Sequence, residues 1–191
     1  MIKTKQFVLL YLMNTCSVFI GLFIAAEWKV YWQTATNAPT DHFMATAGSF
    51  GSVFNGMRFI WSWLLDHYSY KAVYGTLLVV EITVGVTMPF LLSRKWLYTV
   101  WICVGYWCLG GHFTLLPNQV KKVFGGNATQ LYSIIYTYIG IAGITESVLQ
   151  VFVLTSENLT SFFYIYSLLA LCSLVILLTL YEDRPYRVAK D

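Results

Sequence analysis

Three charged side chains, Arg58, Glu81 and Glu146, interrupt long apolar stretches of the sequence. A charge inside a membrane is costly unless it is paired or hydrated. Such residues therefore indicate either an internal ion pair or a site for a proton, an ion or a charged solute. These three side chains are the first candidates for chemistry.

Arg58 and Glu81 flank a short charged turn, Asp66–Lys71. Arg58 is eight residues before Asp66, and Glu81 is ten residues after Lys71. At a rise of about 1.5 Å per residue, both lie roughly 12–15 Å from the turn on adjacent antiparallel helices. This matching depth predicts an Arg58–Glu81 ion pair, and contact with a ligand is the alternative for each residue.

Glu146 has no basic residue near it in the sequence. Tyr132, Tyr136, Gly143, Glu146 and Gln150 recur at spacings of three, four and seven, which places them on one helical face. One interpretation is a substrate-cavity wall of Tyr132, Tyr136, Glu146 and Gln150, with Glu146 as a proton or substrate-cation site. The other is a protonated Glu146 that is hydrogen-bonded to a neighbouring helix.

The composition indicates that these residues sit in a membrane. The chain has 191 residues, of which 58% are hydrophobic and 11% are charged, whereas soluble domains have about 25% charged residues. The net charge of +3 is spread over loops and ends. It therefore indicates membrane topology rather than nucleic-acid binding.

A bilayer core needs about 20 apolar residues per helix. On that basis the sequence predicts an all-α polytopic membrane protein, in which residues 1–191 form a single six-helix transmembrane domain. The predicted spans are 6–26, 41–65, 72–92, 96–116, 128–154 and 160–181, followed by a charged tail at 182–191.

Six spans put both termini on one side of the membrane. The basic residues on that side are Lys3, Lys5, Lys71, Lys121, Lys122, Arg184, Arg187 and Lys190, and those on the opposite side are Lys29, Arg94 and Lys95. Because basic loops stay on the cytoplasmic side, we expect both termini on the cytoplasmic side or its organellar equivalent. Which membrane this is does not follow from the sequence.

No motif predicts an enzyme, a cofactor or a metal site. The sequence has no His/Cys/Asp cluster, no GxSxG elbow and no phosphate loop. Its four cysteines lie singly in apolar runs, so neither disulfides nor zinc are indicated. His112, near the end of the fourth span, is interpreted as a packed or interfacial histidine rather than a proton relay.

Small residues on the predicted helices would let neighbouring helices approach closely. They are Gly48, Ser52 and Gly56 on the second span, Gly105, Gly110 and Gly111 on the fourth, and Gly140 and Gly143 on the fifth.

The run at 55–71 resembles the hallmark loop of the major facilitator superfamily. Asn55-Gly, Arg58, Trp61, Asp66 and the basic Lys71 match the version found in the oxalate/formate-antiporter-like and monocarboxylate-transporter-like branches. In the family, the acidic residue of this turn meets a neighbouring helix end in one state and releases it in the other. The resemblance therefore implies a conformational latch or ion-pair set of Asn55, Arg58, Asp66, Lys71 and Glu81.

A second stretch supports the same branch. Pro117 and then Phe124-Gly125 are similar to the Pro and Phe-Gly that separate the fourth and fifth helices of a half in these branches. Three features depart from the pattern, and one is that the turn has His67 and Tyr70 where basic residues are common. Ser62 stands where glycine is usual, and the fifth helix carries Glu146 instead of the basic residue that oxalate-type members use for a carboxylate.

The resemblance implies the carboxy-terminal six-helix half of a twelve-helix transporter, in which the solute lies between two halves. We therefore expect half of a secondary transporter for a small organic solute, monocarboxylate- or dicarboxylate-like. Its expected partners are the lipid bilayer, a second six-helix half or other membrane subunits, and the solute, with no nucleic acid. The alternatives are a non-transporting accessory membrane subunit and a fragment of a full-length transporter.

Overall fold

The computed structural model describes residues 4–37, 42–152 and 159–182, and within these ranges all regular structure is helical. Helices suit an apolar environment because they satisfy every backbone hydrogen bond within one segment. The elements are α1 (Lys5–Thr36), α2 (His42–Gly56), α3 (Phe59–His67), α4 (Tyr70–Thr87), η1 (Met88–Leu91), α5 (Lys95–Phe124), η2 (Gly125–Asn127), α6 (Ala128–Ile135), α7 (Thr137–Phe152) and α8 (Leu159–Thr179). The predicted all-helical class is confirmed.

Four helical stretches are long and apolar enough to cross a membrane, which fits an integral multi-pass membrane protein. They are Lys5–Thr36, Tyr70–Leu91, Lys95–Phe152 and Leu159–Thr179. The predicted count of six differs because the second predicted span is divided into α2 and α3. The fifth is divided into α6 and α7, which join α5 in a single long stretch. Six spans therefore remain a prediction.

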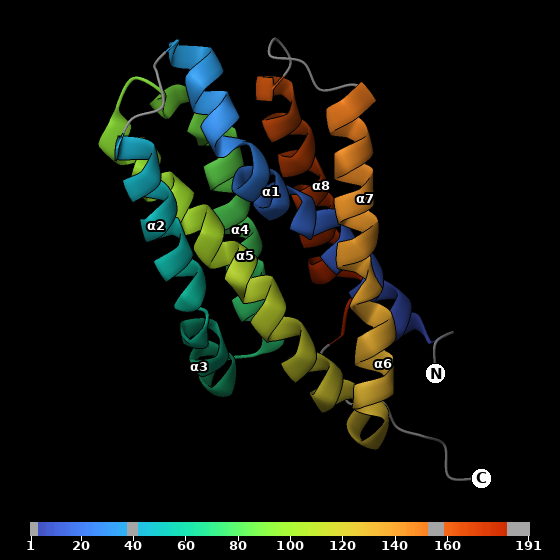
Figure 1. The fold of residues 1–191 in the computed structure, drawn as a ribbon. Helices are drawn as coiled ribbons and strands as arrows, with labels where there is room; N and C mark the ends of the chain where they lie inside the picture. Colours follow the sequence, from blue (N-terminus) through green and yellow to red (C-terminus); the bar gives the residue numbers. More distant parts are fainter. Residues whose placement is uncertain (1–3, 38–41, 153–158, 183–191) are drawn as a thin grey trace, which may run out of the picture.

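The two divided helices are each interrupted by a tight turn. Between α2 and α3, the Trp61 N–H donates to the Arg58 carbonyl, 3.1 Å away. Between α6 and α7, the Ile139 N–H donates to the Tyr136 carbonyl, 3.2 Å away. Both bonds reach back three residues instead of four, which tightens the helix locally. In each case the second segment continues from the end of the first (Figure 1).

Two helices extend beyond the spans predicted for them. α1 continues ten residues beyond the predicted end at residue 26 and so includes Glu27 and Lys29. α5 runs through Pro117 to Phe124, although the sequence predicted a connection from 117 onwards. Membrane helices tolerate proline where neighbouring groups satisfy the freed carbonyl. α5 ends instead at Gly125, whose φ of 56° favours glycine.

α1 lies at the centre of the bundle and packs on α8, α5 and α7 (Figure 1). α2 packs on α5, and α4 packs on α8. α1 begins and α8 ends at the same end of the bundle, which we call the terminal end (Figure 1). The core is rich in large aromatic side chains such as Trp28, Tyr74 and Phe163. Apolar side chains such as Phe152, 80% exposed, cover the outside, as expected for a surface in lipid.

Two close helix contacts are at Gly110 and Gly111 of α5. A Cβ atom on Gly110 would lie 2.8 Å from the carbonyl oxygen of Asn55, and one on Gly111 would overlap Leu77. The prediction of close approach is therefore confirmed at these two positions. It was wrong for Gly56, Gly140 and Gly143, where a Cβ atom would meet open space.

Replacing Gly110 with alanine should lower the free energy of unfolding by about 1–3 kcal/mol, because the obstructing atom is a backbone oxygen that cannot rotate away. The matched control is Gly140→Ala in α7, which should leave stability unchanged or raise it by up to about 1 kcal/mol through helix propensity. Thermal denaturation in detergent measures both variants. Equal stability of the two would contradict the close approach of α2 and α5.

Candidate functional site

Arg58 lies in the turn between α2 and α3, where its Cβ atom packs against Gly110 of α5. Its side chain is exposed. Among the residues that the structure describes, no carboxylate forms an ion pair with it. Arg58 lies within electrostatic range of Tyr136, which belongs to a different helix.

The predicted Arg58–Glu81 ion pair was wrong. Glu81 points into the core instead, where its Oε1 and the Nε2 of His112 share a hydrogen bond of 3.0 Å. The spacing of the two residues from the Asp66–Lys71 turn specified their heights along the helices. It did not specify the direction in which each side chain leaves its helix. Arg58 faces outward, whereas Glu81 is 1% exposed.

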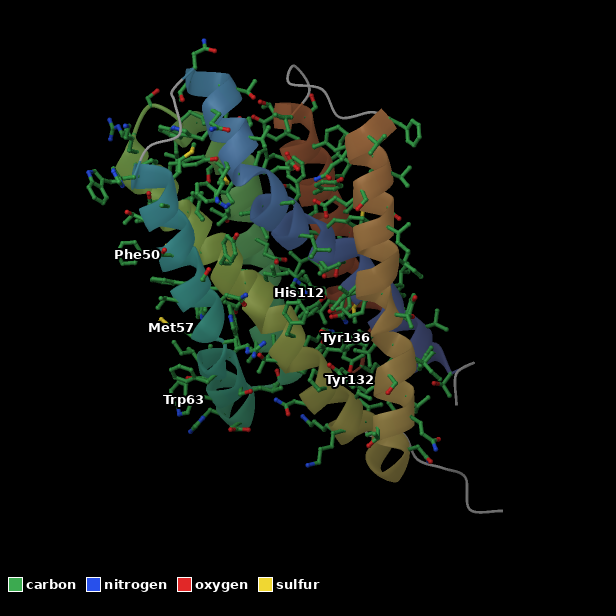
Figure 2. The ribbon with its side chains drawn as sticks, viewed as in Figure 1. Phe50, Met57, Trp63, His112, Tyr132 and Tyr136 are labelled. Atoms are coloured by element: carbon green, nitrogen blue, oxygen red, sulfur yellow. The ribbon has the colours of Figure 1, made fainter. Side chains whose placement is uncertain are left out.

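Tyr132 and Tyr136 lie at the second tight turn, the one between α6 and α7. Their rings are 5.2 Å apart, and Tyr136 also packs at 6.2 Å against Phe113 of α5. Both rings are half-buried. In Figure 2, Tyr136 lies at about the same height as Met57, the residue before Arg58. We call Asn55, Arg58, Tyr132 and Tyr136 together the Arg58 face.

The two turns of the Arg58 face flank α5 at matching depth. Arg58 is nine residues from the end of α3, and Tyr136 is eight residues from the start of α6. At about 1.5 Å per residue, they lie roughly 13 and 12 Å from the terminal end. In the predicted six-span arrangement, that depth is near the middle of a hydrocarbon core about 30 Å thick. The Oδ1 of Asn55 is buried there and has no hydrogen-bond partner within the described ranges.

Glu146 and Gln150 do not belong to the Arg58 face. Glu146 is 5% exposed, and its helix packs on α1. The Gln150 amide donates a hydrogen bond to the Glu27 carboxylate, and Glu27 lies within electrostatic range of Glu146. The tight turn after Ile135 thus separates the predicted stripe into two pairs, with Tyr132 and Tyr136 against α5 and with Glu146 and Gln150 against α1.

Sequence reasoning missed Glu27 because the first span was ended one residue before it. The sequence contained a signal for it, because apolar residues lie before Glu27 and continue after it at Trp28 and Val30. The Oε1 of Glu146 is buried and has no hydrogen-bond partner in the described part of the chain. Glu27, Glu146 and Gln150 therefore form a second polar cluster, of which Glu146 is buried and the other two are half-buried.

Lys71 and Asp66 have separate roles in this conformation. The Nζ of Lys71 donates to the carbonyl oxygens of Leu178 and Tyr181, at 2.9 and 3.3 Å. A cation at this position satisfies the open carbonyl groups at the end of α8. It is also attracted by the negative end of the α8 dipole. Asp66 is exposed, and no side-chain partner is found for it among residues 4–37, 42–152 and 159–182.

No protein-family model matches this chain, and no curated protein matches it. The resemblance to the major facilitator superfamily therefore remains a prediction that rests on the residues quoted for it.

The geometry predicts that the Arg58 position is open to water and the Glu146 position is not. In a background with the four native cysteines changed to alanine, Arg58→Cys should react at least ten times faster than Glu146→Cys with a membrane-impermeant thiol reagent. The physical reason is the difference between an exposed and a buried side chain. Equal labelling rates in membrane vesicles would contradict the assignment of Arg58 to a hydrated face.

Proposed function

We propose that this chain is one six-helix half of a secondary transporter of the major-facilitator type, and that it binds a small carboxylate on the Arg58 face. The observation that carries the proposal is Arg58 itself. It is an exposed cation at mid-depth, in the first of the two tight helix turns, without an ion-pair partner among the described residues. A cation at this depth is stabilised by an anion or by water.

The side chains of the face suit a carboxylate. The planar guanidinium of Arg58 stays charged and can bind a carboxylate through two parallel hydrogen bonds. The hydroxyls of Tyr132 and Tyr136 can each donate one more. Among the residues described on this face there is one full positive charge. A monocarboxylate therefore suits this half alone, and a dicarboxylate would need a second cation from the other half.

The arrangement of the helices supports an inverted repeat of two three-helix units. We assign α1, α2–α3 and α4 to the first unit, and α5, α6–α7 and α8 to the second. Each middle helix carries a tight turn, and each packs on the first helix of the other unit, α2 on α5 and α7 on α1. The third helices, α4 and α8, pack on each other. Inverted repeats with interrupted helices at the solute site are typical of secondary transporters.

In this proposal the chain crosses the membrane six times, with both termini on the cytoplasmic side. A second half, supplied by another chain or by a second copy, covers the Arg58 face and completes the site. Alternating access then requires the two halves to rock against each other. Asp66 is exposed at the terminal end, where it can meet a helix end of the second half in one state and release it in the other.

Uptake of radiolabelled acetate, lactate, oxalate and succinate into proteoliposomes tests the proposal. Arg58→Gln should reduce uptake of the transported carboxylate roughly 10- to 150-fold, because a charged hydrogen bond contributes about 1.5–3 kcal/mol. Arg58→Lys should keep part of the activity, since it retains the charge without the bidentate geometry.

Arg94→Gln is the matched control, since it removes an exposed arginine at the far end of the bundle and should leave uptake unchanged. Uptake that stays at background for all four carboxylates, with and without a pH gradient, would contradict the proposed transport.

The second candidate function is that of a non-transporting membrane subunit. It is favoured by the single cation of the Arg58 face and by Glu146, which stands where the oxalate-type members carry a basic residue. This candidate predicts a stable complex with other membrane proteins after mild detergent extraction. A chain that runs alone as a monomer or homodimer would argue against it.

A further inference from the structure

A groove of about 270 Å³ lies between α2 and α5. Phe43, Ala47 and Phe50 contribute to its α2 wall, at spacings of four and three residues that place them on one helical face. Because the small side chain of Ala47 lies between two aromatic ones, the surface of α2 is hollowed there. In Figure 2, Phe50 lies at the edge of the bundle, on the side away from α7. The groove therefore opens at the perimeter of the bundle, outside the Arg58 face.

The walls of the groove are apolar, although two threonines belong to them. The hydroxyl of Thr46 donates to the carbonyl oxygen of His42 at 2.8 Å, and the hydroxyl of Thr99 donates to the carbonyl oxygen of Lys95 at 3.0 Å. Each hydroxyl is thus bonded within its own helix, as is common for threonine in helices. The methyl groups and aromatic rings of the walls suit a hydrocarbon chain better than a polar ligand.

One end of the groove is positively charged. α2 and α5 both begin at the far end of the bundle, away from the terminal end (Figure 1), and Lys95 is the first residue of α5. Its Nζ lies 5.4 Å from the centroid of the Phe43 ring, a cation–π contact that places the ammonium group at the groove. Arg94, the preceding residue, is also exposed. Two adjacent cations at the end of an apolar groove are complementary to a ligand with an anionic head and an apolar chain.

The dimensions of this surface match one leaflet of a bilayer. Trp96 lines the groove next to Lys95 and is 77% exposed, as expected for a tryptophan at the level of lipid headgroups. From Phe43 to Val53, α2 advances about 15 Å at about 1.5 Å per residue, which is half of a hydrocarbon core about 30 Å thick. Phe50 and Val53 are exposed along this path. An acyl chain with its headgroup at Lys95 would therefore reach the middle of the bilayer along α2.

We propose that the groove between α2 and α5 binds one acyl chain of an anionic phospholipid, with the lipid phosphate at Lys95 and Arg94. The bound chain fills a space that the side chains of the two helices leave open, and so it stabilises their contact. The site lies outside the Arg58 face, and no step of the proposed transport uses it. The lipid site therefore does not depend on whether the chain transports a solute.

Quenching of Trp96 fluorescence by phospholipids with brominated acyl chains tests the proposal in the full chain. The chain has seven tryptophans, so the Trp96 contribution is the difference between the wild type and Trp96→Phe. In mixed bilayers of phosphatidylglycerol and phosphatidylcholine, one lipid is brominated at a time, and the ratio of the two quenching constants measures the preference at Trp96. We expect phosphatidylglycerol to be preferred at least about fivefold, which is the contribution of one cation near a membrane surface.

Two variants separate the headgroup contact from the chain contact, each compared with the same variant carrying Trp96→Phe. Lys95→Gln should lower the preference about fivefold, because it removes one cation. Thr46→Phe keeps the cations but fills the groove with a ring, so the preference should fall towards one. The matched control is Thr83→Phe on α4, which replaces another exposed threonine whose hydroxyl bonds within its own helix. This control should leave the preference unchanged.

Equal quenching of Trp96 by the two lipids in the wild type would overturn the lipid site. A preference that is unchanged in either Lys95→Gln or Thr46→Phe would overturn the proposed position of the headgroup or of the chain, respectively. If neither lipid quenches Trp96, a second copy or another membrane protein covers the groove, which would also overturn the proposal.

A second measurement does not depend on tryptophan. A ligand that binds only the folded protein raises its stability, so added phosphatidylglycerol should raise the midpoint of thermal unfolding in detergent more than phosphatidylcholine does. The difference between the two lipids should be smaller in Lys95→Gln and unchanged in Lys121→Gln, which removes an exposed lysine at the other end of α5. An equal rise with both lipids in the wild type would contradict the anionic headgroup site.

Discussion

The carbonyl oxygen of Asn55 occupies the space that a side chain at position 110 would need. This contact holds the tight turn between α2 and α3 directly against the backbone of α5. Three residues after Arg58, the ring of Trp61 stacks on the ring of Trp107, with their centroids 4.4 Å apart. The Nε1–H of Trp61 also donates a hydrogen bond to the carbonyl oxygen of Trp107. Both contacts fix the turn that carries the exposed Arg58. A larger residue at 110 would therefore move Arg58 relative to Tyr136.

The polar groups of the bundle fall into two kinds. Inside, Glu81 bonds to His112, and between α1 and α7 the half-buried Glu27 accepts a hydrogen bond from Gln150. Outside, Arg58 has no ion-pair partner among the described residues. Since an unpaired charge is unstable in lipid, the Arg58 face must meet water, an anion or another protein.

The sequence predicted the helical class and the distance of Arg58 from the Asp66–Lys71 turn, because apolar length and helical rise are local properties. It did not predict where helices are interrupted. Gly56 precedes the first turn, but no proline or glycine marks the second, at Tyr136. It also did not predict the direction of each side chain, so Glu81 was paired with Arg58 instead of His112. That direction depends on contacts such as Gly111 with Leu77, which form only when the helices pack.

The central claim is that Arg58 binds a carboxylate at mid-depth on a face completed by a second half. A cryo-electron microscopy map of the assembled protein in nanodiscs, recorded with the carboxylate that supports uptake, tests it most directly. The account predicts density for the carboxylate between the guanidinium of Arg58 and the hydroxyls of Tyr132 and Tyr136, with six helices of a second half facing it. A map in which Arg58 pairs with a carboxylate side chain of a neighbouring subunit, leaving no space for a solute, would contradict it.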